Sequence, residues 1–287
     1  MKNRNRYTLL IGLVVVATIA WQSCTEKIDI KLSSTNTRCV IYGEITTDTT
    51  AHKVRITKSA DYFINEPPEP ISGATISITD GSSTFPLAES VSEPGNYYTD
   101  SDVYGVPGNT YTLNVSNVDL LGDGNLLSYT AYSELKPVSA IDDIVIQFNS
   151  DYDFWEIRLW ATDPAETEDY YLFKAYINGV LYSDSLNNLS ITDDKFFNGN
   201  NANGSPVIRV VEEDSIKVDD IISLDICGIS KDYYNFIIEA QTMTGTQVPM
   251  FSGPPANVRT NINNGALGYF AAYSINTISR KVRGSQK

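Results

Sequence analysis

The first half of this chain consists of short stretches of alternating apolar and polar residues, separated by turn-forming residues. Alternation of this kind is typical of β-strands that have one buried face. In one stretch it places Tyr111, Leu113 and Val115 on the same face, and Pro107-Gly108 supplies the turn before it. Short strands at this spacing predict a β-sandwich. The predicted strands are 39–47, 53–59, 74–79, 96–99, 110–115 and 129–133.

Residues 136–138 (Lys-Pro-Val) predict a domain boundary, because longer apolar segments follow them. One segment has a helical pattern, with Ser230 as a candidate N-cap and Gly245 as a candidate stop. The sequence therefore predicts a mainly β protein with two domains. Residues 38–136 would form an immunoglobulin-like β-sandwich, and residues 141–283 an antiparallel β-rich domain with one helix near 230–244. The strands predicted in this second domain are 143–149, 154–162, 170–178, 180–183, 207–211, 221–227, 257–262 and 267–278.

The N-terminus has the pattern of a secretory signal. Lys2, Arg4 and Arg6 precede an apolar run, residues 9–20, and Cys24 follows shortly after it. The run is too short to span a membrane, for which about 20 residues are needed. We therefore predict a lipoprotein signal peptide over 1–23, lipidation at Cys24 and a flexible tether over 24–37. An ordinary secreted protein with an incidental cysteine is the alternative.

The charge of the chain excludes several classes of partner. After removal of residues 1–23 the chain keeps 18 basic and 35 acidic residues, a net charge of −17. Nucleic acids and anionic lipid surfaces bind positive protein surfaces, so no nucleic-acid partner is expected. The sequence indicates no cofactor.

Two cysteines remain after Cys24, and the sequence leaves their state open. An exported protein could pair Cys39 with Cys227 in a disulfide. Each also lies in an apolar segment, as buried free thiols do.

Catalytic machinery is hard to find. The one histidine, His52, follows a threonine-rich turn, and we expect it to be exposed on a loop. The chain has no Gly-x-Ser-x-Gly motif and too few His and Cys residues for a zinc site. We therefore predict no catalytic residues and no metal site. A calcium loop is the lesser alternative, and its oxygen ligands would be Asp193, Asp194, Asn198 and Asn200.

The strand predicted over 154–162 is rich in aromatic residues. Alternation places Phe154, Glu156, Arg158 and Trp160 on one face, opposite an apolar face. Aromatic rings beside an ion pair could bind a sugar or a peptide. The alternative is a structural ion pair between packed aromatic rings.

Several segments occur in the order found in a known family. In the first half they are residues 40–43, 53–59, 71–78, 95–97 and 107–113; near the end they are 230–236, 254–255, 261–262 and 267–273. The chain resembles domain-of-unknown-function family 4249, lipoproteins of the Bacteroidota. The resemblance implies an envelope lipoprotein, often encoded beside a TonB-dependent outer-membrane receptor, and supplies no catalytic residues. Thr49, Ser185 and Ser215 lie in tripeptides that look like O-glycosylation acceptors of these bacteria.

We therefore expect a non-catalytic, lipid-anchored protein of the cell envelope, held in the outer membrane by its N-terminal lipid. It would bind a ligand or act as an accessory partner of a TonB-dependent receptor. The alternative function is an enzyme that hydrolyses envelope glycans or peptides, and a purely structural role is a third. Both the periplasmic and the outer face of the membrane are compatible with the sequence.

Overall fold

The computed structural model describes residues 37–60, 67–182, 185–211, 216–244 and 258–283. These residues belong to one compact unit, residues 36–287. The predicted division of this unit into two domains near residues 136–140 stays a prediction.

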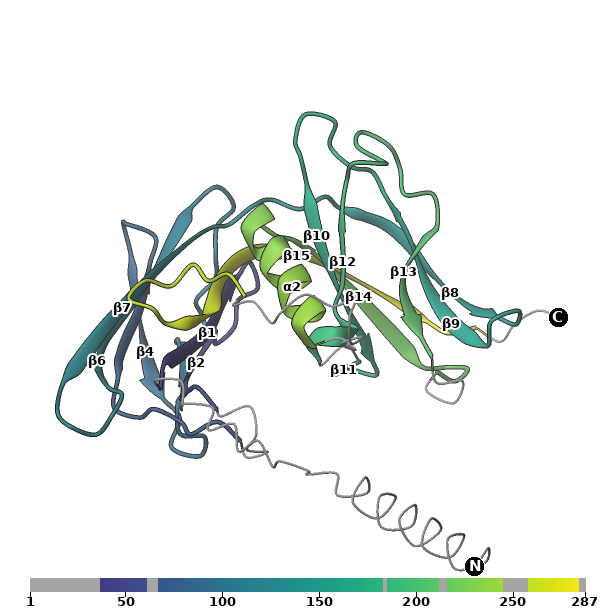
Figure 1. Ribbon diagram of the computed structural model, residues 1–287. Helices are drawn as coiled ribbons and strands as arrows, with labels where there is room; N and C mark the ends of the chain where they lie inside the picture. Colours follow the sequence, from purple (N-terminus) through teal and green to yellow (C-terminus); the bar gives the residue numbers. More distant parts are fainter. Residues whose placement is uncertain (1–36, 61–66, 183–184, 212–215, 245–257, 284–287) are drawn as a thin grey trace, which may run out of the picture. The chain divides into compact units, whose positions relative to one another are not determined.

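Strands make up most of the described chain, which confirms the predicted mainly β fold (Figure 1). A single α-helix, α2, and one short 3₁₀-helix, η1 (Leu186–Asn188), accompany the strands in the described ranges. The strands in the first half are β1 (Cys39–Thr46), β2 (Lys53–Lys58), β3 (Thr75–Thr79), β4 (Thr84–Glu89), β5 (Asn96–Tyr98), β6 (Thr110–Asp119) and β7 (Leu126–Glu134). The later strands are β8 (Ile141–Asn149), β9 (Phe154–Ala161), β10 (Tyr170–Ile177), β11 (Val180–Leu181), β12 (Ser190–Asp193), β13 (Ser205–Val210), β14 (Ile221–Gly228) and β15 (Leu267–Lys281).

The strands form two sheets. The larger has the order β11-β10-β14-β15-β1-β2-β5-β4-β3-β6-β7, and β12 also pairs with β10. The smaller has the order β13-β9-β8. Every pairing between named strands is antiparallel except that of β1 with β15, which is parallel.

The first-half strands enclose a core at the positions that the alternation predicted. Tyr111, Leu113 and Val115 of β6 are buried together with Tyr97 of β5. The Tyr97 hydroxyl donates to the Ile71 carbonyl at 3.0 Å, so the buried ring keeps a hydrogen bond at its polar end.

The last strand, β15, completes this core although it lies at the other end of the chain (Figure 1). It pairs with β1 on one side and with β14 on the other, and its Phe270 and Ala272 pack against the first-half core. The close approach to β1 requires Gly268, whose φ is +94°. A Cβ atom there would lie 2.0 Å from the Ile41 carbonyl oxygen.

The strand predicted over residues 257–262 is wrong in the part that is described; residue 257 lies outside. Ile262 makes only an isolated bridge to Ala131. The reason is that the Asn261 side chain replaces a strand ladder: its Nδ2 donates to the Phe270 carbonyl at 2.7 Å, and its Oδ1 accepts from the Phe270 amide at 3.0 Å. The chain then turns back at Gly265, which has a positive φ.

In the second half, the face of β10 and β14 that carries Phe173 and Leu224 packs against β8, β9 and β13, in a second core. The helix α2 (Lys231–Thr244) covers the other face through Phe236 and Ile237 (Figure 1). The Ser230 Oγ accepts a hydrogen bond from the Tyr233 amide at 3.2 Å, as a helix N-cap does. The predicted helix and its N-cap are therefore confirmed, and the candidate stop, Gly245, lies outside the described residues.

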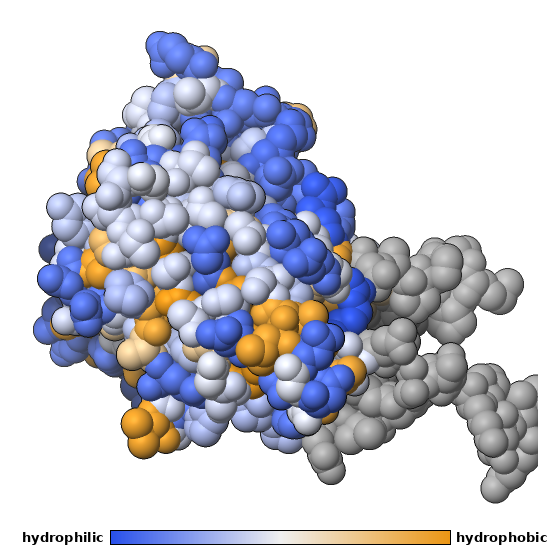
Figure 2. Space-filling model, turned by 90° about the vertical axis from the view of Figure 1, so that its left-hand side faces the viewer, coloured by the Kyte–Doolittle hydropathy of each residue, from blue (hydrophilic) through white to orange (hydrophobic). Residues whose placement is uncertain are grey.

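Two surface properties complete the description. Hydrophobic residues gather in separate patches on the face drawn in Figure 2, amid mostly hydrophilic ones. Within the described ranges no helix has both the length and the apolar character needed to cross a membrane.

Candidate functional site

A cavity of about 440 Å³ lies where β9, β10, β12 and β13 meet. Its walls include the apolar side chains of Leu159, Phe173, Ile191, Phe197 and Val207. The hydroxyl and amide groups of Ser, Thr and Asn residues line the remainder, together with one charged side chain, that of Asp163. A mostly apolar cavity with a few polar groups is the usual form of a small-molecule site.

Asp163 lies just after the end of β9 and is only 6% exposed. Its Oδ1 accepts a hydrogen bond from the Tyr171 hydroxyl at 2.5 Å, and its Oδ2 accepts one from the Gly199 amide at 3.1 Å. Burial and the hydrogen bond to this carboxylate raise the pKa of the Tyr171 hydroxyl far above its ordinary value. Tyr171 is therefore a neutral donor to the carboxylate.

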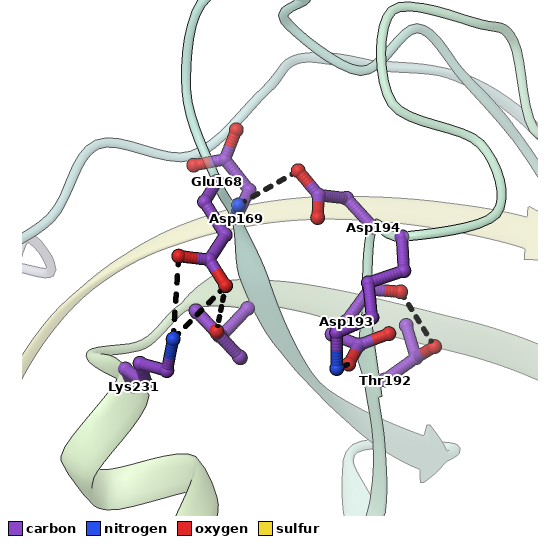
Figure 3. Close-up of polar contacts among 8 residues, drawn as sticks. Glu168, Asp169, Thr192, Asp193, Asp194 and Lys231 are labelled. Carbon is purple, nitrogen blue, oxygen red and sulfur yellow. Dashed lines mark hydrogen bonds and ion pairs between the residues drawn. The ribbon is translucent and has the colours of Figure 1, made fainter.

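Asp163 belongs to a cluster of three carboxylates with Asp169 and Asp194, whose oxygen atoms lie within 4.8 Å of one another. Asp169 directly precedes β10 and Asp194 directly follows β12. These two strands pair antiparallel, so the two residues are brought together at the same end of the ladder. The Asp194 Oδ2 accepts a hydrogen bond from the Asp169 amide at 2.8 Å (Figure 3).

Two of the three clustered carboxylates are buried, and Lys136 is a basic residue whose charge acts on Asp169 from beyond ion-pair distance. Asp194 is 1% exposed, and no Lys or Arg of the described segments forms an ion pair with any of the three carboxylates. Burial raises the pKa of the Asp169 carboxyl, and the charges of Asp163 and Asp194 raise it further. Nearby Glu168 does have a partner, Lys231, at 3.0 Å (Figure 3). Three carboxylates at this spacing could hold a hard divalent cation or act as acid and base.

The structure separates most of the calcium ligands considered from the sequence. Of that set, only Asp194 joins the cluster. Asp193 pairs instead with Lys195 at 2.6 Å. The amide groups of Asn198 and Asn200 donate to backbone carbonyls, of Thr167 and of Asn198 itself.

Sequence reasoning missed Asp163, Asp169 and the cavity. The available signal was that an aspartate follows the strand predicted over 154–162 and another precedes the strand predicted over 170–178. That signal does not say which strand ends meet in space.

The side chains predicted to form a ligand-binding face do share one side of β9, and their contacts are internal. Glu156 is 6% exposed and pairs with Arg158 at 2.8 Å, while the Arg158 Nε donates to the Gly204 carbonyl at 2.7 Å. Phe154 lies 5.4 Å from the Arg209 guanidinium, and the Trp160 ring packs directly on Gly204. These are contacts of the structural alternative, and the binding role of this face stays a prediction.

The expectation that His52 is exposed is wrong, because the side chain is only 3% exposed. Its Nε2 lies 3.2 Å from the Val103 carbonyl oxygen, and its backbone amide donates to the Thr99 hydroxyl at 2.9 Å. The turn therefore folds the ring inward. Burial lowers the pKa of the imidazole, which favours its neutral form.

Both remaining cysteines, Cys39 and Cys227, are buried free thiols rather than a disulfide. Burial raises the pKa of each thiol to about 12, so neither is a thiolate at neutral pH.

The modification sites predicted from the sequence stay predictions. Thr49 and Ser185 are exposed outside the strands, as a modified side chain must be. Cys24 and Ser215 lie outside the described residues.

Comparison with known proteins adds a family. A family model described as "Domain of unknown function (DUF4249)" matches residues 25–279. The search of curated proteins found no match. Among solved structures, the chain is similar to a DUF4785 family protein from Legionella pneumophila, at 8% identity and a TM-score of 0.25. That similarity covers 67% of this chain and 51% of the other, so the chain spans about half of the length of that protein.

Proposed function

The chain belongs to the DUF4249 family, and we propose that it is a non-catalytic, lipid-anchored envelope protein that binds a small ligand. The ligand would occupy the cavity between β9, β10, β12 and β13. The observation that carries the proposal is this cavity, whose volume of about 440 Å³ lies within the range of small-molecule sites, roughly 300–1,000 Å³.

Sequence features support the proposed location in the cell envelope. The basic residues, the short apolar run and Cys24 have the order of a lipoprotein signal. The high negative charge argues against nucleic acid as the ligand. We further propose that a TonB-dependent outer-membrane receptor is the partner, which would place ligand capture beside a transporter.

Filling the cavity tests the proposal. Ala202 lines the cavity, so Ala202→Trp should occupy part of it, whereas Ala51→Trp on an exposed loop should not. A library of fluorinated fragments would be measured by ¹⁹F NMR against the wild-type protein and both variants. We expect several fragments to bind the wild type and Ala51→Trp, and to lose binding to Ala202→Trp. The proposal fails if no fragment distinguishes the two variants.

A hydrolase remains the second candidate, because Asp163, one of the three clustered carboxylates, lines the cavity. The raised pKa of Asp169 would suit a general acid. Hydrolysis of an envelope glycan or peptide that is abolished in Asp169→Asn, with an unchanged circular dichroism spectrum, would establish an enzyme. Equal rates with and without the protein would favour the binding function.

A further inference from the structure

We propose that the ligand of this cavity is an amphipathic cation, with an apolar or aromatic body and one ammonium or guanidinium group that lies against Asp163. This inference rests on the proposed function, since it names the ligand class of the same site.

The lining of the cavity offers a ligand two kinds of contact, one charged and the other apolar. Among the described lining residues Asp163 is the only charged one, and several of the others are apolar. The rings of Phe173 and Phe197 each stack beside Tyr171, with centroids 6.4 and 6.3 Å away. The rings of Phe173 and Phe197 would therefore pack against an apolar body of the ligand, while a single polar group of the ligand reaches the Asp163 carboxylate.

Asp163 lacks a positive partner in the described structure. Its two hydrogen-bond donors, the Tyr171 hydroxyl and the Gly199 amide, are both neutral. An ionised carboxylate has about four acceptor sites, so the two donors leave acceptor capacity on each oxygen. A buried charge without a counter-charge is costly, and a cationic ligand would remove that cost on binding.

The neighbouring carboxylates select for charge rather than for a neutral donor. Carboxylate oxygens of Asp169 and Asp194 lie within 4.8 Å of one of Asp163, so both residues add to the negative potential around it. An anionic ligand would be repelled there, and a neutral alcohol would gain one hydrogen bond but no Coulombic attraction. A bare metal ion would satisfy the carboxylates but leave the apolar part of the 440 Å³ cavity unused.

Three probes with the same body test the charge preference: 3-phenylpropylammonium, 3-phenylpropanol and 3-phenylpropanoate. Their affinities for the purified full chain would be measured at pH 7 by isothermal titration calorimetry. We expect the ammonium to bind at least tenfold more tightly than the alcohol, and the carboxylate to bind more weakly than both. Equal affinities, or a preference for the carboxylate, would overturn the cation while leaving the cavity as a ligand site.

Variants locate the charge. Asp163→Asn keeps the shape of the side chain and should reduce the ammonium-to-alcohol ratio below threefold, because it removes the negative charge that attracts the ammonium. Asp151→Asn, on the exposed turn between β8 and β9, should keep the tenfold ratio. Asp169→Asn leaves the acceptor of Tyr171 in place and should lower the ratio two- to fivefold; it serves if Asp163→Asn does not fold. An unchanged ratio in both Asp163→Asn and Asp169→Asn would contradict the proposal.

The remaining outcomes are also decisive. If calcium chloride alone binds at micromolar concentration and displaces the ammonium probe, the site is a metal centre and the proposal is wrong. If none of the three probes binds the wild-type protein, the amphipathic cation is rejected. The fragment experiment then decides separately whether the cavity binds any ligand, so the two proposals can fail independently.

Discussion

Replacing Gly268 with alanine should strongly destabilise the protein, because this residue allows β15 to lie against β1. Its φ of +94° is unfavourable for a residue with a Cβ, at about 1–3 kcal/mol. The added Cβ would also lie 2.0 Å from the Ile41 carbonyl oxygen, whereas ordinary contacts begin at 3.4 Å. Overpacking a well-packed region costs about 1–3 kcal/mol more. The expected loss in the free energy of unfolding is thus roughly 2–6 kcal/mol.

Gly108 offers a matched control for this substitution. Its φ is +90°, and a Cβ there would have no atom within 4 Å. Gly108→Ala should therefore cost only the backbone component, about 1–3 kcal/mol. Urea unfolding of both variants, followed by tryptophan fluorescence with linear extrapolation, gives the two free energies. If Gly268→Ala is no more destabilising than Gly108→Ala, the close approach of β15 to β1 is refuted.

Three further changes test other parts of the chain. Cys24→Ala should release the protein into the soluble fraction, because it removes the residue that would carry the acyl chains on which stable anchoring depends. Retention on membranes after a carbonate wash would contradict lipidation. His52→Gln should weaken the loss of stability on acidification: the imidazole pKa is lower in the folded than in the unfolded protein, so its contribution is complete above pH of about 6.5 and is lost below it. Identical pH dependence in wild type and His52→Gln, measured by thermal unfolding between pH 7.5 and 5, would disprove this. Trp160→Ala should lower the free energy of unfolding by about 1–3 kcal/mol, because the ring packs on Gly204 but is partly exposed. A fully buried aromatic residue would cost about 3–5 kcal/mol. Loss of ligand binding with unchanged stability would instead favour the predicted binding face.

Sequence patterns over a few residues correctly predicted the features that depend only on neighbouring residues. The alternation in β6 identified its buried side chains, and Ser230 identified the start of α2, because a strand face and a helix cap depend on a few adjacent residues. The pairing of β1 with β15 could not be predicted in this way. The paired residues Ile41 and Gly268 are 227 positions apart, and no local pattern specifies a partner at that separation.

In the candidate site, too, local features could be predicted from the sequence and long-range pairings could not. Asp163 and Asp169 lie beside predicted strand ends, whereas β12, which positions Asp194, was not predicted; only the pairing of β10 with β12 brings Asp169 and Asp194 together. The cavity is still harder to predict from the sequence, since its walls come from strands of both sheets. His52 illustrates the limit for a single residue, because its position after a turn gave no sign that the ring would fold inward.

The place of β15 in the sheet also affects the order of events during synthesis. The end of β15, Lys281, is 147 residues beyond the end of β7, Glu134. At about 5–20 residues per second, a ribosome needs roughly 7–30 s to cover that distance. Throughout this interval the edge of β1 lacks its partner strand and the first core lacks Phe270. An unpaired strand edge is a template for association with other chains, so we expect the nascent protein to be most prone to such association before β15 is complete.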